Sequence, residues 1–188
     1  VTALHFFFIS LINEPGASTH AALMRREAKK RVICLDPNIL PTVIRKKAPY
    51  LKLLKSLIPM ADILKISDED VKWITGGSDF AGAAKKWLKL GPKIVIVTKG
   101  GEGVEAFTTR YHVSKAAVKV KVVDTVGAGD TFTAGLLGSL EHVGALTKAK
   151  LAVIDEATLA SCLDYAAKAA SITCSRAGAN PPWANEMA

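Results

Sequence analysis

Cysteine, aromatic residues and long apolar runs are all scarce in this chain. Only 3 of its 188 residues are cysteine, and 6% are aromatic. Cys34, Cys162 and Cys174 stand at spacings that fit neither a zinc site nor a disulfide framework, which predicts reduced core thiols and a cytoplasmic protein. No apolar run approaches the ~20 residues that a membrane span requires. These absences exclude the membrane-spanning and fibrous classes, and they predict one domain over residues 1–188 with no membrane partner.

Acidic residues are few beside the basic ones. The chain carries 25 Lys and Arg against 17 Asp and Glu, a net charge of +8. The segment 25–55 holds ten basic and two acidic residues and so accounts for the whole excess. A basic stretch can bind nucleic acid, but this one coincides with helical apolar spacing and contains only one aromatic residue, Tyr50. We interpret it as solvated helix faces and expect no nucleic-acid partner.

Short apolar runs alternate with helical patterns along the chain. Strands are predicted over 1–12, 31–35, 61–66 and 93–98, the last being a β-branched run typical of a strand buried on both faces. Helices are predicted over 79–90, 129–144 and 156–174, and two or three short antiparallel strands over 104–123, where valines alternate with lysines. This order predicts an α/β fold, a three-layer α/β/α sandwich with a mostly parallel central sheet.

The start of the chain is an apolar run with no initiator methionine. Residues 1–12 read VTALHFFFISLI, without a basic segment or a cleavage site. This pattern argues against a secretory signal and favours a buried strand. A chain that opens on a core strand leads us to expect that the natural protein begins further upstream.

The most informative segment is 123–137, VDTVGAGDTFTAGLL. Gly127 and Gly129 allow a tight turn in which successive N–H groups converge at the start of a helix, and such a helix start is an anion site. Asp130 lies in the first helical turn, where a carboxylate can accept a proton from a hydroxyl held beside the anion. These are the two groups that phosphoryl transfer to an alcohol requires. The alternative is a structural loop with Asp130 as a helix cap.

The segment 124–135 resembles the C-terminal signature of the pfkB, or ribokinase-like, family of carbohydrate kinases. Further matching motifs stand in the family's order: LDPN at 35–38, ADILKIS at 61–67, VTKGGEG at 97–103 and RAGA at 176–179. The motifs ISLINEPGAS, LDPN and LKISDED look most like those of bacterial fructokinases. The resemblance implies a ribokinase-like fold, with the family's first strands and β lid outside this chain.

The resemblance also implies roles for particular residues. Asp130 would be the general base, and the amides of Gly127, Ala128 and Gly129 would form the anion hole for the γ-phosphate. The residues that would position ATP are Lys65, Ser67, Asp70, Thr98, Lys99, Gly100, Gly101 and Gly103. Asp36 and Asn38 would lie near the phosphates or the metal, although Asp-Pro-Asn is also a strong turn sequence and Ser67 also fits a plain helix cap. A monovalent cation site would involve Asp124, Val126, Thr173, Arg176 and Gly178.

These matches imply a phosphotransferase that uses ATP and Mg²⁺ to phosphorylate a small-molecule sugar. The first expectation for the sugar is fructose, and K⁺ is a possible additional cofactor. Another sugar or nucleoside kinase, such as a ribokinase or a ketodeoxygluconate kinase, and a catalytically inactive ATP-binding fragment remain alternatives. A homodimer is a possible state of the intact protein. Three residues depart from the fructokinase pattern, because Leu40 stands where Arg is usual and Phe7 and Phe8 stand where Gly-Ser is usual.

Overall fold

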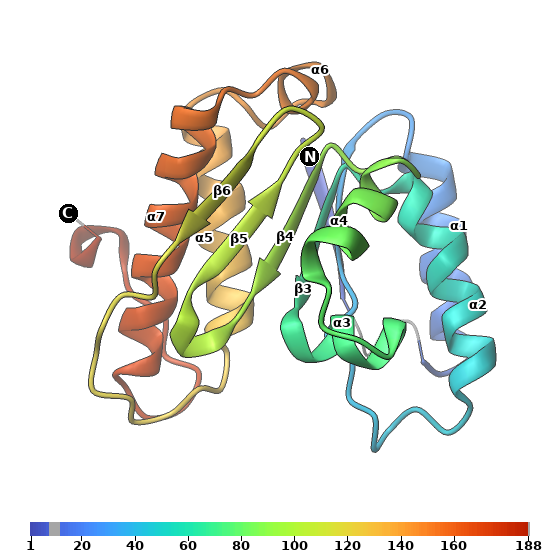
Figure 1. Ribbon diagram of the computed structural model, residues 1–188, viewed down its shortest axis with the longest axis horizontal. Helices are drawn as coiled ribbons and strands as arrows, with labels where there is room; N and C mark the ends of the chain where they lie inside the picture. Colours follow the sequence, from blue (N-terminus) through green and yellow to red (C-terminus); the bar gives the residue numbers. More distant parts are fainter. Residues whose placement is uncertain (8–11, 188) are drawn as a thin grey trace.

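The centre of the molecule is a six-stranded sheet. The structure is a computed structural model that describes residues 1–7 and 12–187. The strands lie in the order in which they occur along the chain (Figure 1), namely β1 (Ala3–Phe7), β2 (Val32–Asp36), β3 (Ile63–Ser67), β4 (Ile94–Thr98), β5 (Val104–Phe107) and β6 (His112–Lys115). The first four strands pair in parallel, and β5 and β6 are antiparallel additions at one edge. The predicted mostly parallel sheet is therefore confirmed.

Helices cover both faces of this sheet (Figure 1). One face packs against α1 (Gly16–Glu27), α2 (Lys47–Leu57), α3 (Asp68–Thr75) and α4 (Phe80–Leu88). The other packs against α5 (Ala128–His142), α6 (Lys148–Ala152) and α7 (Glu156–Cys174). Short 3₁₀ turns occupy η2 (Ile58–Met60), η3 (Gly100–Glu102) and η4 (Ala184–Glu186). The β-branched run of β4 serves both cores, because Val95 and Val97 face α1–α4 whereas Ile94 and Ile96 face α5–α7.

The structure of segment 116–123 differs from the predicted one. Its alternating valines were expected to form part of a third antiparallel strand, but the chain has no strand there. Val118 and Val122 are exposed by 45% and 61%, and none of the strands among the described residues pairs with this stretch. Alternation predicts a strand only where a partner edge exists, since an isolated strand leaves its backbone groups unpaired. Instead the valines form one wall of a cavity.

The opening strand is shorter than predicted. It runs over Ala3–Phe7, and the part of the prediction that includes Phe8 lies outside the described residues. Parallel pairing brings Phe7 opposite Asp36 and Ser67 opposite Thr98. The carboxyl ends of β1–β4 therefore meet at one edge of the sheet, which is where ligands gather in open α/β folds.

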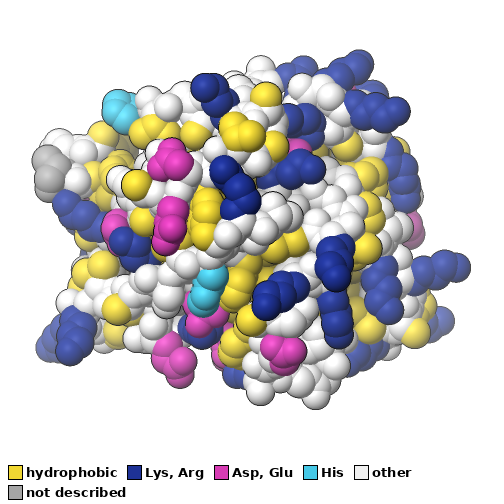
Figure 2. All heavy atoms as spheres, turned by 45° about the horizontal axis from the view of Figure 1, so that its top comes forward, with side chains coloured by type: hydrophobic (Ala, Val, Ile, Leu, Met, Phe, Trp, Pro, Cys, Tyr) yellow, Lys and Arg dark blue, Asp and Glu magenta, His cyan; other side chains and the backbone are white. Residues whose placement is uncertain are grey.

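The basic side chains of segment 25–55 lie mostly on the surface of α1, α2 and the loops beside them. Figure 2 shows lysine and arginine side chains gathered on the right-hand side of the molecule, where Figure 1 places α1 and α2. All ten basic residues of 25–55 are exposed except Arg31, which is half-buried. Arg26 and Arg31 pair with Glu27. Within the described part of the chain, no helix has the length and apolar character that crossing a membrane demands.

Candidate active site

A cavity of about 280 Å³ opens between the end of β4, the start of α5, segment 117–122 and α7; we call it the β4–α7 cavity. Sequence-predicted residues from two distant motifs meet in its wall: Thr98, Gly100, Gly101, Gly103, Ala128 and Gly129. The two motifs are brought together because β4 ends and α5 begins at the same edge of the sheet. The structure thus assembles one recess from segments that the sequence separates by about thirty residues.

Free amides point out of the start of α5. Gly127 is the N-cap with φ 78°, a left-handed conformation that glycine adopts without steric cost. The Thr131 amide donates to the Gly127 carbonyl at 2.8 Å, and the Ala128 amide donates to the Thr125 carbonyl at 3.2 Å. The amides of Gly127 and Gly129, and that of Asp130, find no acceptor within the described chain. These three groups, together with the helix dipole, can hold an anion, whereas the amide of Ala128 is already engaged.

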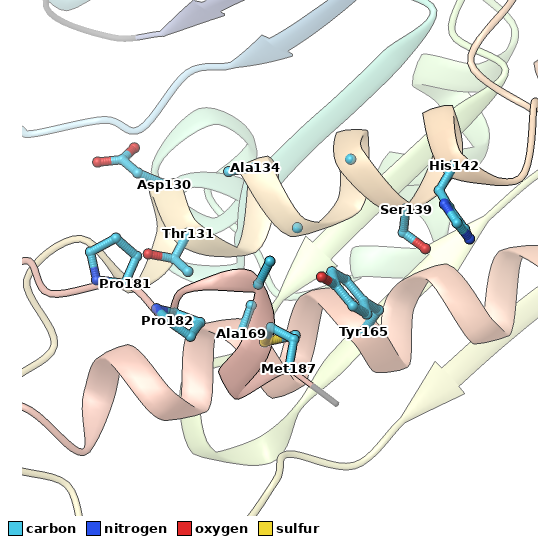
Figure 3. A pocket seen from close by; sticks show the side chains of 13 residues that line it. Asp130, Thr131, Ala134, Ser139, His142, Tyr165, Ala169, Pro181, Pro182 and Met187 are labelled. Atoms are coloured by element: carbon cyan, nitrogen blue, oxygen red, sulfur yellow. The ribbon is translucent and has the colours of Figure 1, made fainter.

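Asp130 lies on the rim of a second recess. This recess, the α5–α7 groove, has a volume of about 700 Å³ and runs along the outer side of α5 and α7. Figure 3 shows Asp130 at one end of α5 and Ser139 and His142 at the other. The Asp130 side chain is exposed, and no ion pair engages it within the described residues. A free carboxylate in the first turn of a helix with free amides combines a proton acceptor with an anion site.

A buried ion pair connects β2 and β3 below the start of α5. Lys65 Nζ donates to Asp36 Oδ2 at 2.7 Å, and the two side chains are only 7% and 2% exposed. A Cβ placed on Gly129 would lie 3.2 Å from Lys65 Nζ. The ammonium group therefore lies next to Gly129, one of the residues with a free amide, and it adds positive charge to the anion site.

Ser67 and Asp70 act together as a capping box for α3. The Asp70 amide donates to Ser67 Oγ at 3.0 Å, and Asp70 Oδ2 accepts from the Ser67 amide at 3.3 Å. Asp70 Oδ1 also accepts from the Ile39 amide at 2.9 Å. Burial raises the pKa of Asp70, while the hydrogen bonds from Ser67 and Ile39 act in the opposite direction. The helix-cap role of Ser67 is thus observed, and its role toward a ligand stays a prediction.

Two further predicted residues make structural contacts. Lys99 pairs with Glu105 and lies 5.3 Å from the centre of the Phe80 ring, and it does not line the β4–α7 cavity. Asn38 has φ 36°, and its amide donates to Asp36 Oδ1 at 3.1 Å. The Asp-Pro-Asn segment therefore forms the tight turn that its composition favours, and this turn holds the carboxylate of Asp36 toward Lys65.

Gly103 allows β6 to approach the loop after β4, which yields a stability prediction. It has φ 108°, and a Cβ there would lie 2.1 Å from the Lys115 carbonyl oxygen. We expect Gly103→Ala to lower the free energy of unfolding by about 2–3 kcal/mol, measured by urea denaturation. Gly101→Ala is the matched control, because Gly101 has no positive φ and no atom within 4 Å of its Cβ position. Equal losses in the two variants would contradict the prediction.

The predicted monovalent-cation residues also come together. Asp124 Oδ1 accepts from the Val126 amide at 3.0 Å, and Oδ2 accepts from the Gly178 amide at 2.9 Å. These hydrogen bonds lower the pKa of Asp124. The Arg176 amide donates to the Thr173 carbonyl at 3.1 Å. The guanidinium of Arg176 pairs with Glu186, so that it also anchors the C-terminal segment.

His5 is a residue of this edge that the sequence analysis did not select. It stacks on Phe7 with ring centroids 5.7 Å apart, and its Nδ1 is buried without a hydrogen bond to any described residue. Burial lowers the pKa of His5, and the nearby carboxylate of Asp36 opposes that effect. A sequence-based prediction of how β1 pairs with β2 could have indicated this position of His5. Phe7 is 43% exposed and Leu40 is 47% exposed, so neither disrupts the core.

No ready-made metal cluster accompanies these groups. Across residues 1–7 and 12–187, no three His, Cys, Asp or Glu side chains gather in a way that could hold a metal ion. Apart from the exposed Asp130, the candidate carboxylates at this end of the sheet are already hydrogen-bonded, Asp36 to Lys65 and the Asn38 amide, and Asp70 to the backbone amides of Ile39 and Ser67. This donor set offers no direct site and fits a metal held mainly by phosphate oxygens and water.

Comparison with known proteins identifies relatives that match most of the chain. The chain is 46% identical over 157 residues to a fructokinase from Rhizobium leguminosarum bv. trifolii, which covers 84% of this chain and 48% of that protein. It is 33% identical over 181 residues to the probable fructokinase-7 of Arabidopsis thaliana, covering 94% of this chain and 51% of the relative. The chain thus spans about half the length of these curated relatives.

Solved structures share the fold. A fructokinase with bound ATP from Xylella fastidiosa superposes with a TM-score of 0.85 at 24% identity, covering 95% of this chain and 57% of that one. An aminoimidazole riboside kinase from Salmonella enterica also gives a TM-score of 0.85 at 24% identity, over 98% of this chain and 61% of the other. The model of the pfkB family of carbohydrate kinases matches residues 3–186. The predicted resemblance is confirmed, and the chain belongs to the pfkB carbohydrate kinase family.

Proposed function

We propose that this chain is the nucleotide-binding part of an ATP-dependent sugar kinase, with fructose as the phosphate acceptor. The observation that carries the proposal is the arrangement at the start of α5. There, three free amides, the buried ammonium of Lys65 and the exposed carboxylate of Asp130 gather around Gly129, which lines the β4–α7 cavity, while Asp130 lies on the rim of the α5–α7 groove. The identity of the acceptor is supported by the 46% identity to a bacterial fructokinase.

The arrangement suits in-line transfer of a phosphoryl group. The amides of Gly127, Gly129 and Asp130 face the position where negative charge gathers on the γ-phosphate during transfer. The carboxylate of Asp130 accepts the proton of the sugar hydroxyl as the new oxygen–phosphorus bond forms. The bond from the γ-phosphorus to the bridging oxygen breaks, and the electron pair stays with ADP. Lys65 contributes positive charge from below the amides and keeps Asp36 neutralised.

The cations belong to the proposal as well. Bound Mg²⁺ would neutralise phosphate charge, and its protein contacts would run through water to Asp36 and Asp70, whose oxygens already accept hydrogen bonds. A bound K⁺ would take carbonyl oxygens of the 124–126 loop and the 173–178 segment. Asp124 holds these two segments together through the amides of Val126 and Gly178. Intracellular action on a sugar follows from the proposed reaction, which consumes ATP.

The test is a pair of measurements on the same 188-residue sample. ATP binding is measured by calorimetry in the presence of Mg²⁺, and ADP release is then measured with fructose, ribose, 2-keto-3-deoxygluconate or a nucleoside as acceptor. We expect ATP binding and ADP release that depends on fructose. Release with another acceptor but not with fructose would overturn the acceptor assignment. Binding without release for any acceptor would leave an ATP-binding chain without catalysis, and absence of ATP binding would overturn the whole proposal.

A further inference from the structure

We propose that the ring of Phe7 is an aromatic platform for the acceptor sugar, which lays a face of carbon-bound hydrogens against it. This role rests on the proposed function, because it concerns the acceptor of the same reaction. Phe7 is the last residue of β1 and stands where the fructokinase pattern usually has glycine. The platform is therefore a feature of this chain, and it would determine how tightly the acceptor binds.

Phe7 lies in one row with the charged groups near the anion site. Parallel pairing places Phe7 opposite Asp36 on β2. On the next strand, Leu64 lies opposite Leu35, so the residues that follow them, Lys65 and Asp36, are neighbours. Side chains at paired positions share a face of the sheet, and the ion pair between Asp36 and Lys65 shows this directly. Because two strand spacings separate β1 from β3, Phe7 stands about 10 Å from Lys65 across the sheet.

The face that carries this row is the one covered by α5. Two positions earlier on the same strands, Cys34 and Ile63 are buried against α5–α7, and alternate residues of a strand share a face. A Cβ placed on Gly129 would lie 3.2 Å from Lys65 Nζ. A phosphate held by the free amides of α5 would therefore lie near Lys65, with Phe7 two strands away. An acceptor whose hydroxyl reaches that phosphate can extend over the row to the ring of Phe7.

The Phe7 ring is supported on one side and open on the other. It lies nearly parallel to the His5 ring, with centroids 5.7 Å apart and an angle of 18° between the planes. Phe7 is 43% exposed, whereas Nδ1 of His5 is buried. Burial lowers the pKa of His5, and the carboxylates of Asp36 and Asp130 both oppose that effect, so the start of α5 lies within electrostatic range of this ring pair. A ring whose orientation is already set loses little side-chain freedom when a ligand covers it.

A sugar matches this combination of groups because it has two kinds of surface. Its hydroxyl groups require polar partners, and the carboxylate of Asp130 can accept a proton from the reacting one. Its carbon-bound hydrogens form an apolar face that gains from contact with an aromatic ring, since the ring face is negative. Sites for small molecules generally combine aromatic surfaces with a few polar groups that fix orientation. Phe7 supplies the aromatic surface here, and Asp130 supplies the polar group.

Saturation-transfer NMR tests the contact directly, because it detects weak sugar binding and reports which protons lie near a ring. Irradiation of the aromatic protons, with ADP and Mg²⁺ present, should transfer saturation to the carbon-bound protons of fructose. We expect Phe7→Ser to remove most of this transfer and to raise the dissociation constant of fructose by about five- to tenfold. The affinity for ADP, measured by calorimetry, should not change. Phe7→Tyr keeps the ring and should retain both the transfer and the affinity for fructose.

Tyr165→Ser is the matched control for Phe7→Ser. Tyr165 is 40% exposed, close to the value for Phe7, and Figure 3 shows it near Ser139, at the end of α5 far from Asp130. Its replacement removes an aromatic ring of similar exposure outside the row. We expect this variant to bind fructose as tightly as the unsubstituted chain.

The possible results distinguish the role of Phe7 from the proposed function. Unchanged fructose binding in Phe7→Ser would overturn the role of Phe7, and tighter binding would also overturn it by showing that the ring obstructs the acceptor. An equal loss of ADP and fructose affinity would assign Phe7 to the fold alone. If the unsubstituted chain binds ADP but not fructose, the acceptor assignment in the proposed function fails, and the platform fails with it.

Discussion

Replacing Asp130 by asparagine is expected to reduce fructose-dependent ADP release by about 10²–10⁴-fold, the usual contribution of a positioned general base. The amide has nearly the same size as the carboxylate but cannot accept the hydroxyl proton. Asp130 is exposed and takes part in no ion pair among the described residues. The fold should therefore tolerate the change, and the free energy of unfolding should shift by less than about 0.5 kcal/mol, as for other surface substitutions.

Nucleotide binding distinguishes a catalytic role of Asp130 from a structural one. Removal of a negative charge beside the phosphates should leave ATP affinity unchanged or raise it slightly, because like charges repel. A loss of ATP affinity of tenfold or more would mean that Asp130 shapes the anion site instead of acting as a base. The measurement remains informative whatever the turnover of the unsubstituted chain.

Glu141→Gln provides a matched control for Asp130→Asn. Glu141 is an exposed carboxylate on the same helix, in its last turn, so the substitution makes the same change of charge far from the free amides. We expect this variant to keep both turnover and ATP affinity. A similar loss of turnover in both variants would point to the net charge of α5, and would contradict the assignment of Asp130 as base.

The parallel part of the fold could be predicted from the sequence because its signals are local. The run Ile94–Thr98 predicts a strand buried on both faces, and the structure places its alternate side chains in two different cores. Ser67 followed by acidic residues predicts a helix start, and the capping box of α3 confirms it. In each case the residues that determine the element lie within a few positions of one another.

Other features depend on contacts that a local pattern does not contain. The valines of segment 116–123 have the alternation of a strand, yet no described strand pairs with this segment, and Val118, Val120 and Val122 line a cavity instead. The Ala128 amide was expected in the anion hole, and the turn to Thr125 engages it. Lys99 was assigned to the nucleotide because of its motif; the structure shows its ion pair with Glu105 on the adjoining strand, and its role toward a nucleotide stays a prediction. Each of these outcomes is decided by a neighbour that only the folded chain brings into place.

The ion pair between Lys65 and Asp36 also joins residues that lie far apart in the sequence, and among these contacts we expect it to contribute most to the free energy of unfolding. We expect Lys65→Met to lower the free energy of unfolding by about 3–5 kcal/mol, because it leaves the carboxylate of Asp36 buried without its counter-charge. Asp36 is 2% exposed, so water cannot replace the lost ammonium group. Equilibrium urea denaturation with an unchanged m-value would measure the loss.

A double variant keeps this prediction testable even if Lys65→Met fails to fold. Asp36→Asn combined with Lys65→Met removes both charges, and replacing a buried pair by uncharged groups is often nearly neutral. We therefore expect the double variant to be more stable than Lys65→Met alone. A double variant as unstable as the sum of the two single variants would show that the two side chains act independently.

An exposed ion pair on α3 provides a comparison for the stability effect of the buried pair. Lys72 Nζ lies 2.6 Å from Asp68 Oδ2, a distance close to that of the buried pair, but the Lys72 side chain is 50% exposed. We expect Lys72→Met to cost less than about 1 kcal/mol, because solvent screens such pairs. Equal costs at the two positions would contradict burial as the source of the effect.

Lys65→Met should also weaken the binding of ATP more than that of adenosine, since Lys65 Nζ lies next to Gly129 and adenosine carries no phosphate. A parallel loss for both ligands would assign Lys65 to the fold alone, whereas a selective loss for ATP would make its ammonium group part of the phosphate site.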